Sequence, residues 1–390
     1  MKLSLFLFTA ILFAGLSCME PQDNSIITGA ERMELYLDSV KGVPVGLLGN
    51  HTSLVGGTHL VDTLLSVGVD IIKIYSPEHG FRGTADAGEE IDSGTDSRTG
   101  IRIISLYGSR RQPSDEDLAG IEVLVFDLQD VGTRFYTYIS TLQLAMEKCA
   151  ELGIKMILLD RPNPNGFYVD GPILDTAYRS FVGMQQIPVV HGMTIGEYAM
   201  MLNGEGWLSG GVKCKLTVIP CSNYTHKSYY KLPLGPSPNL PNQVSVYLYP
   251  SLCFFEGTVV SCGRGTDAPF QLFGHPDLNG YPFSFTPVPG PGSANPVLRG
   301  QLCYGLDLRN AMEEGLVPSP GINLSWLIDA YRNFPDRDSF FNNYFNTLAG
   351  GEELRRQIEA GLSEEQIKET WQSGLSKFKV IRKKYLLYSE

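Results

Sequence analysis

Segments typical of strands alternate with segments typical of helices from Glu31 to about Asp160. The apolar runs at 123–128 and 155–160 are short and unbroken, as in strands that are covered on both faces. Strands separated by helices favour a parallel sheet with crossover helices. We therefore predict a Rossmann-like α/β domain with a parallel sheet. Its predicted strands are 43–48, 71–75, 102–106, 122–128 and 155–159, and its predicted helices are 31–41, 59–67, 114–118 and 136–152.

After about Phe181 the sequence becomes rich in proline and glycine, for example between Pro276 and Pro296. Short strands such as 215–219 and late helices at 325–333 and 363–373 indicate a different architecture. A chain of 390 residues has room for two domains, because one core usually stops growing at about 250–300 residues. We expect the Rossmann-like domain to span 24–180 and a second, smaller α+β domain to span 181–390 and complete a cleft.

The first residues have the layout of a secretory signal. Lys2 precedes an apolar stretch from Leu3 to Ala14, and small residues lead into Cys18. This arrangement predicts a signal peptide over 1–17 and an exported protein, either periplasmic or associated with the outer membrane. Lipidation of Cys18, which would tether the chain to a membrane, and ordinary cleavage nearby both fit the pattern.

Charge and motifs exclude several classes of function. The formal net charge of −11 argues against nucleic acid and anionic membrane surfaces as partners, although one or two arginines can hold a small anionic substrate. The first predicted strand is not followed by G-x-G-x-x-G, and the sequence contains no P-loop, no G-x-S-x-G and no H-E-x-x-H. We therefore expect no cofactor and no metal.

Three predicted strands end in polar loops that contain glycine or proline. These loops are YSPEHGFRG at 75–83, DLQDVGTR at 127–134 and DRPNPNG at 160–166. In open parallel sheets ligands bind beyond the carboxyl ends of the strands. The sequence therefore predicts a binding or catalytic site at this edge of the sheet.

The candidate catalytic residues are Glu78, His79, Asp127 and Asp130. Glu78 follows a strand end and a proline, where partial loss of water would raise its pKa toward that of a general acid. The alternative is a loop carboxylate that pairs with Arg82 or His79. Asp127 and Asp130 equally fit as caps of the following turn and helix.

Further residues in these loops and in the second half are candidates for substrate binding. They are Arg82, Arg134, Tyr136, Asp160, Arg161, Asn163, His191, Asn239 and Arg264. Tyr136 also fits as a core aromatic, and Asp160 with Arg161 as a buried salt bridge. Arg264 lies between two glycines, as expected of an anion clamp, and follows the polar segment that begins at Glu256. Thr194 and Glu197 form the pattern of a helix capping box.

Several segments resemble the bacterial exo-β-N-acetylmuramidase family (NamZ-like), long described as a domain of unknown function. In chain order they are YSPEHGFRG, DLQDVGTRFYTYISTL, LDRPNPNG, HGMTIGE, PSPNLP, and FEGT with GRGTDAPFQ. The resemblance implies a peptidoglycan-recycling glycosidase that removes β-1,4-linked N-acetylmuramic acid from the non-reducing end of cell-wall fragments. It places the glutamate of the family's EHG motif at Glu78, as general acid. Where some relatives carry a glutamate before GRGT, this chain has Cys262.

This implied substrate suggests roles for the candidates. Its lactyl carboxylate suits an arginine, with Arg82, Arg134, Arg161 and Arg264 available, and its 2-acetamido group can act as the nucleophile. Asp127, Asp130, His79 and Tyr136 are candidates for orienting that amide. A covalent route through an aspartate and inversion through water stay open. An exported binding protein for muropeptides is the alternative function, and a metal-dependent hydrolase is a third.

Overall fold

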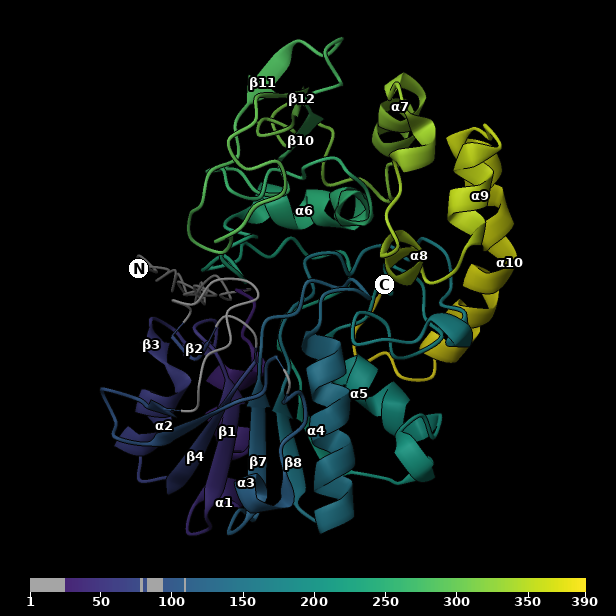
Figure 1. Ribbon diagram of the computed structural model, residues 1–390. Coiled ribbons are helices and arrows are strands. Elements are labelled where there is room, and N and C mark those ends of the chain that lie inside the picture. The colour runs from purple at the N-terminus through teal and green to yellow at the C-terminus, as the bar shows by residue number, and fades with distance from the viewer. Residues whose placement is uncertain (1–24, 78–79, 83–93, 109) are drawn as a thin grey trace, which may run out of the picture.

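The structure, a computed structural model, describes residues 25–77, 80–82, 94–108 and 110–390. The predicted signal segment and Cys18 lie outside these residues, as do Glu78 and His79. Figure 1 shows two domains, one built on a large sheet and a smaller one that carries α6 and a small sheet. The predicted fold class is confirmed, because a mostly parallel sheet of seven strands forms the first domain.

The large sheet has the strand order β5-β6-β4-β1-β7-β8-β9. Every neighbouring pair is parallel except β5 and β6, which are antiparallel. The bounds are β1 Val45–Gly49, β4 Ile71–Ser76, β5 Gly94–Thr95, β6 Arg102–Ser105, β7 Val123–Asp127, β8 Lys155–Leu159 and β9 Lys215–Ile219. A two-stranded antiparallel ribbon, β2 Leu54–Val55 with β3 Thr58–His59, follows β1 in the chain.

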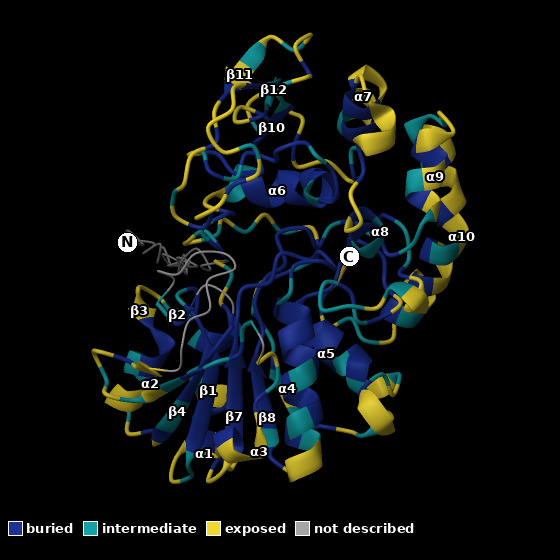
Figure 2. Cartoon of the chain, in the orientation of Figure 1, coloured by how far each residue is buried: buried dark blue, intermediate teal, exposed yellow. Residues whose placement is uncertain are grey.

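Helices cover both faces of this sheet, which explains the unbroken apolar strands. Leu124 and Phe126 of β7 belong to the same core as the side chains of α4, whereas Val123 and Val125 pack with those of α1 and α2. Figure 2 shows the central strands as buried. The helices of this domain are α1 Leu37–Val40, α2 Leu60–Ser66, α3 Asp115–Leu118, α4 Tyr138–Leu152 and α5 Ile195–Gly204.

Two expectations for the first domain were wrong. The helix predicted at 31–41 is instead two 3-10 turns, Gly29–Glu31 and Met33–Leu35, followed by α1. The backbone of Arg32 leaves the helical region and interrupts the segment. The strand at 215–219, which we placed in the second domain, is β9, the edge strand of the large sheet next to β8. β9 is partly exposed, as is typical of an edge strand, so its sequence lacks the unbroken apolar run that indicates a central strand of this sheet.

The second domain contains a three-stranded antiparallel sheet in the order β10-β12-β11. Its strands are β10 Leu272–His275, β11 Phe283–Phe285 and β12 Cys303–Asp307, and its helices are α6 Gln243–Leu252, α7 Ser325–Asn333, α8 Phe345–Ala349, α9 Glu353–Glu359 and α10 Glu364–Arg382. Short 3-10 turns of this domain occur at Cys253–Gly257 and Arg337–Ser339, and two further ones, Thr176–Tyr178 and Ser209–Gly211, precede β9 in the first domain. α10 begins with a capping box at Ser363 and continues beyond residue 373, where we expected the helix to end.

One apolar core passes through both domains. Leu142 of α4 and Leu248 of α6 belong to the same buried cluster. Phe135, just before α4, makes edge-on ring contacts with Tyr249 and Phe254 at centroid distances of 5.2 and 5.9 Å. This shared packing holds the carboxyl end of β7 against the second domain. Within the described part of the chain, no helix is both long enough and apolar enough to cross a membrane.

Candidate active site

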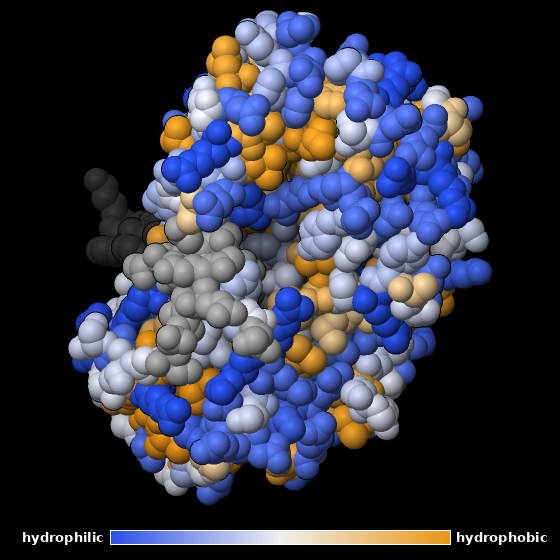
Figure 3. Space-filling view, viewed as in Figure 1, coloured by the Kyte–Doolittle hydropathy of each residue, from blue (hydrophilic) through white to orange (hydrophobic). Residues whose placement is uncertain are grey.

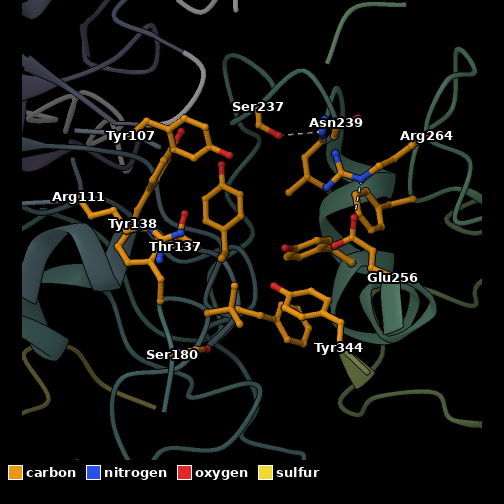
Figure 4. Close-up of a pocket in the computed structure, with 17 residues that line it drawn as sticks. Tyr107, Arg111, Thr137, Tyr138, Ser180, Ser237, Asn239, Glu256, Arg264 and Tyr344 are labelled. Carbon is orange, nitrogen blue, oxygen red and sulfur yellow. Dashed lines mark hydrogen bonds and ion pairs between the residues drawn. The ribbon is translucent and has the colours of Figure 1, made fainter. Parts of the chain in front are cut away.

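A cavity of about 420 Å³ lies between the two domains. Figure 3 shows a hollow in this part of the surface, and Figure 4 shows the side chains that line the cavity. One wall comes from residues just before and at the start of α4 and from residues 180–182, and the other comes from α6, the segments on either side of it and Tyr344. The aromatic lining residues are Tyr107, Phe135, Tyr136, Tyr138, Phe181, Tyr249, Phe270 and Tyr344, and the charged ones are Arg111, Glu256 and Arg264.

Glu256 and Arg264 form an ion pair in the wall of the cavity. Arg264 Nε donates to Glu256 Oε1 at 2.6 Å, and the guanidinium carbon lies 5.1 Å from the Phe270 ring centroid. Burial opposes the charged form, but the nearby Glu256 carboxylate raises the pKa of Arg264. Gly263 and Gly265, with φ of 82° and 79°, allow the loop to place Arg264 between them. The pair therefore presents a fixed, charge-balanced polar group to the cavity.

Two tyrosines just before and at the start of α4 connect the cavity wall to loops that are distant in sequence. Tyr136 Oη donates to the carbonyl of Pro236 at 3.0 Å, and its ring contacts Tyr138 at a centroid distance of 4.7 Å. Asn50 Nδ2 donates to Tyr138 Oη at 2.7 Å. Asn239 Nδ2 donates to the carbonyl of Gly292 at 2.7 Å. The structure therefore brings Tyr136, Asn239 and Arg264 together from our predicted binding residues.

The structure places Arg134 away from the cavity. Its side chain is fully buried, and burial lowers the pKa of Arg134 to about 9. The guanidinium donates to four backbone carbonyls at 2.8 to 2.9 Å, those of Pro172, Ile187, Leu348 and Ala349. Because two of these lie in or beside α8, Arg134 cross-links the two domains instead of facing a ligand.

Asp127 and Arg161 bind each other and are not among the described residues that line the cavity. Arg161 donates through Nε and Nη2 to the two carboxylate oxygens of Asp127, at 2.5 and 2.8 Å. Both side chains are buried. The salt bridge that we considered for Asp160 is therefore made by Asp127, the residue at the end of the adjacent strand. Asp160 instead accepts from Thr194 Oγ1 at 2.7 Å and Tyr388 Oη at 2.6 Å, and burial raises the pKa of Asp160 to about 6.

Asp130, Asn163 and His191 pack around the turn at Gly132. Asp130 Oδ2 accepts from the Gly132 amide at 2.7 Å and lies 4.0 Å from His191 Nε2. Burial raises the pKa of Asp130 to about 7 and lowers that of His191 to about 3. Gly132 has a φ of 78°, and a Cβ there would lie 2.3 Å from Asn163 Oδ1. These side chains fix the backbone that leads to the cavity residue Tyr136.

Arg82 is bound by carboxylates near β5, at one edge of the large sheet. Its guanidinium binds both oxygens of Asp96 at 2.8 and 3.0 Å and lies 3.6 Å from Asp62 Oδ2. The remaining candidates, Glu78 and His79, fall outside the described residues. No group of three His, Cys, Asp or Glu side chains with metal-binding geometry occurs among the residues that the structure describes.

Comparison with known proteins identifies the family. A model described as "Exo-beta-N-acetylmuramidase NamZ, N-terminal" matches residues 45–244, and its C-terminal counterpart matches residues 247–388. The chain belongs to the NamZ exo-β-N-acetylmuramidase family. It is therefore a member of a family of glycoside hydrolases, and the resemblance stated from the sequence is confirmed.

Individual relatives agree with this NamZ assignment. The chain is 38% identical over 379 residues to the peptidoglycan beta-N-acetylmuramidase NamZ of Bacillus subtilis (strain 168). The match covers 90% of this chain and 89% of the relative. A crystal structure of a DUF1343 family protein from Bacteroides fragilis NCTC 9343 is 48% identical, with a TM-score of 0.87 over 94% of this chain and 99% of that one. A second DUF1343 family protein from that organism is 30% identical, with a TM-score of 0.80 over 93% and 99%.

The two NamZ matches meet between residues 244 and 247, at the start of α6. We had expected the boundary at 180, but the large sheet continues to β9 before the chain enters the second domain. The cavity therefore lies where the two NamZ halves meet.

The sequence did not single out several residues of this NamZ cavity. Arg111, Tyr107, Phe181 and Tyr344 lie in loops without a recognisable motif, and only folding brings them together. Glu256 stood in a polar segment that we noted without assigning it a role. Cys262 is a buried, free thiol close to Arg264.

Proposed function

We propose that the chain is an exo-acting glycoside hydrolase that releases N-acetylmuramic acid from the non-reducing end of peptidoglycan fragments. The observation that carries this proposal is the match of both NamZ halves, in order, over residues 45–244 and 247–388. The Bacillus subtilis relative, named a peptidoglycan beta-N-acetylmuramidase, supports the same substrate class.

The cavity suits the sugar that we propose. Its volume of about 420 Å³ falls in the range of small-molecule sites, roughly 300–1,000 Å³. Rings such as Tyr249 and Phe270 offer apolar faces to the C–H groups of a sugar. Asn239, Glu256 and Arg264 supply polar groups that can bind hydroxyl and amide groups.

We assign the general acid to Glu78. It follows β4, which ends at Ser76, and the carboxyl ends of parallel strands are where ligands bind in such sheets. In this proposal Glu78 protonates the departing glycosidic oxygen as the bond to C1 breaks. The oxygen of the 2-acetamido group forms the new bond to C1, and water then opens this ring with Glu78 accepting the proton. Tyr136 is our candidate for orienting the acetamido group, because it lines the cavity.

The positions of Asp127 and Asp130 favour this substrate-assisted route over a covalent aspartate. Both side chains are buried, and each carboxylate has a partner away from the cavity, Arg161 for Asp127 and the Gly132 amide for Asp130. The carboxylate among the described lining residues is Glu256, which is bound to Arg264.

The test is turnover of a chromogenic β-N-acetylmuramide and of the matching N-acetylglucosaminide by the mature protein. We expect selective hydrolysis of the muramide, loss of at least about 100-fold in kcat for Glu78→Gln, and little change for the exposed control Glu122→Gln. Near wild-type turnover by folded Glu78→Gln contradicts the assignment of the acid. Binding without any turnover by the wild type contradicts the enzyme and supports an exported binding protein.

We also propose that the protein is exported, with residues 1–17 as its signal. Lys2, the apolar stretch that follows it and Cys18 support this location. Mass spectrometry of the mature N-terminus is the test: a chain that starts at or near Cys18 is expected, and added lipid mass would identify the tether. An intact N-terminus in the cytoplasmic fraction contradicts export.

A further inference from the structure

The charges on the wall of the cavity do not balance among the described lining residues. Arg111, Glu256 and Arg264 are the charged side chains there, so the described wall has one excess positive charge. Glu256 already neutralises Arg264 through the bond of 2.6 Å. Arg111 therefore carries the charge that is left without a partner.

Arg111 has the surroundings of an anion-binding side chain. None of the salt bridges among the described residues involves Arg111, and its guanidinium carbon lies 4.5 Å from the ring centroid of Phe181. Stacking on an aromatic ring orients the planar guanidinium without using its N–H donors. Those donors are thus available to a planar carboxylate. Figure 4 shows Arg111 on the opposite side of the cavity from Arg264.

The chain holds Arg111 and its aromatic platform in place. Arg110 pairs with Asp117 at 3.3 Å, and Gln112 Nε2 donates to the carbonyl of Leu144 in α4 at 3.1 Å. Both neighbours of Arg111 are therefore anchored to helices. Phe181 lies in a turn closed by reciprocal bonds of 3.0 Å between the backbones of Ser180 and Gly183. A side chain fixed in this way loses less entropy when a ligand binds.

We propose that Arg111 binds the lactyl carboxylate of N-acetylmuramic acid and so makes the site prefer this sugar to N-acetylglucosamine. The inference rests on the proposed function, because the lactyl group is what distinguishes the two sugars. Among the arginines considered from the sequence, Arg82 and Arg161 are paired with aspartates, and Arg134 binds backbone carbonyls. Arg264 has its charge balanced by Glu256, which leaves it suited to hydroxyl or amide groups.

The test combines binding and turnover. Isothermal titration calorimetry with free N-acetylmuramic acid, its lactyl carboxamide and N-acetylglucosamine gives the preference for the carboxylate. Steady-state kinetics with the chromogenic muramide and glucosaminide give the same preference in kcat/KM. The variants are Arg111→Gln, Arg111→Lys and Arg299→Gln, an exposed arginine outside the cavity as the matched control. Thermal unfolding checks that each variant is folded. Because Arg111 is exposed, we expect its variants to fold like the wild type.

Arg111→Gln is expected to weaken binding of N-acetylmuramic acid by about 10- to 100-fold, as for the loss of a charged hydrogen bond. Binding of the carboxamide and of N-acetylglucosamine should change little. In kinetics the loss should appear mainly in KM, with Arg111→Lys intermediate and Arg299→Gln like the wild type.

The outcomes separate this inference from the proposed function. If the wild type hydrolyses the muramide and Arg111→Gln keeps its full preference for the carboxylate, the role of Arg111 is wrong and the enzyme stands. If the wild type binds the carboxylate sugar through Arg111 without turnover, the proposed activity is wrong and the role of Arg111 stands. A wild type that shows no preference for the carboxylate overturns the role of Arg111 as well.

Discussion

Arg161 donates two hydrogen bonds to Asp127, at 2.5 and 2.8 Å, although the two residues are 34 positions apart in the sequence. The pair joins the carboxyl ends of β7 and β8, where both side chains are removed from water. Arg161 also donates to the carbonyl of Leu54 at 3.0 Å. This pair therefore supports the edge of the sheet from which the cavity segment before α4 departs.

Removing one member of this pair should leave an unpaired buried charge. We expect Arg161→Met to lower the free energy of unfolding by about 3–5 kcal/mol. The double variant with Asp127→Leu should lose clearly less, because neither charge is then left alone. Urea unfolding of both proteins is the measurement. Equal losses in the single and double variants would contradict this role.

Replacing Arg134 should destabilise the contact between the domains. Arg134→Gln leaves several buried carbonyls without donors, so we expect a loss of about 3 kcal/mol or more in the free energy of unfolding. Differential scanning calorimetry should show a lower Tm, while the exposed control Arg299→Gln stays near the wild type. A Tm unchanged by Arg134→Gln is incompatible with the cross-link described above.

Glu256 and Arg264 should act as one unit in catalysis. We expect Glu256→Gln and Arg264→Gln each to reduce kcat/KM for the muramide by about tenfold or more, because either change releases the other side chain from its position. In a double-mutant cycle the coupling should reach about 1 kcal/mol or more. Additive losses would mean that the two residues act independently.

Asp130 should make stability depend on pH. Burial raises its pKa to about 7 from 3.8, so the stabilising contribution of its protonated form is complete below about pH 4 and is lost as the pH rises through about 7. Asp130→Asn stays neutral at all these pH values. The wild-type advantage in the free energy of unfolding over this variant should therefore fall by a few kcal/mol from pH 4 to pH 7.

Urea unfolding at intervals across this range is the measurement, with the exposed Asp70→Asn as matched control. The difference in the free energy of unfolding between the wild type and the control should be the same at each pH. A constant difference for Asp130→Asn, or one that grows with pH, would contradict the burial effect.

Local pattern was sufficient for most of the first domain. The apolar runs of β7 and β8 predicted buried parallel strands because helices cover both faces of the sheet. The same reasoning failed at Arg32, whose backbone conformation breaks the expected helix, and at β9, whose edge position blurred its pattern. Both failures depend on tertiary contacts that no short window of sequence contains.

The site was harder to predict than the fold. Among the strand-end residues, Asp127 binds Arg161, Asp160 accepts from the Thr194 hydroxyl and Arg134 binds backbone carbonyls, since charged groups at a buried sheet edge need partners. The partners of Arg134 in the second domain lie 214 and 215 residues away in sequence. Arg111 lies in a loop without a motif, and only the fold places it opposite Arg264.

The most direct test of the exo-muramidase uses a defined tetrasaccharide of alternating sugars with N-acetylmuramic acid at its non-reducing end. Mass spectrometry of the products should show free N-acetylmuramic acid and a trisaccharide that begins with N-acetylglucosamine, and Glu78→Gln should yield neither. Disaccharide products from an internal cut, or an intact substrate after incubation with folded wild-type protein, would contradict the account.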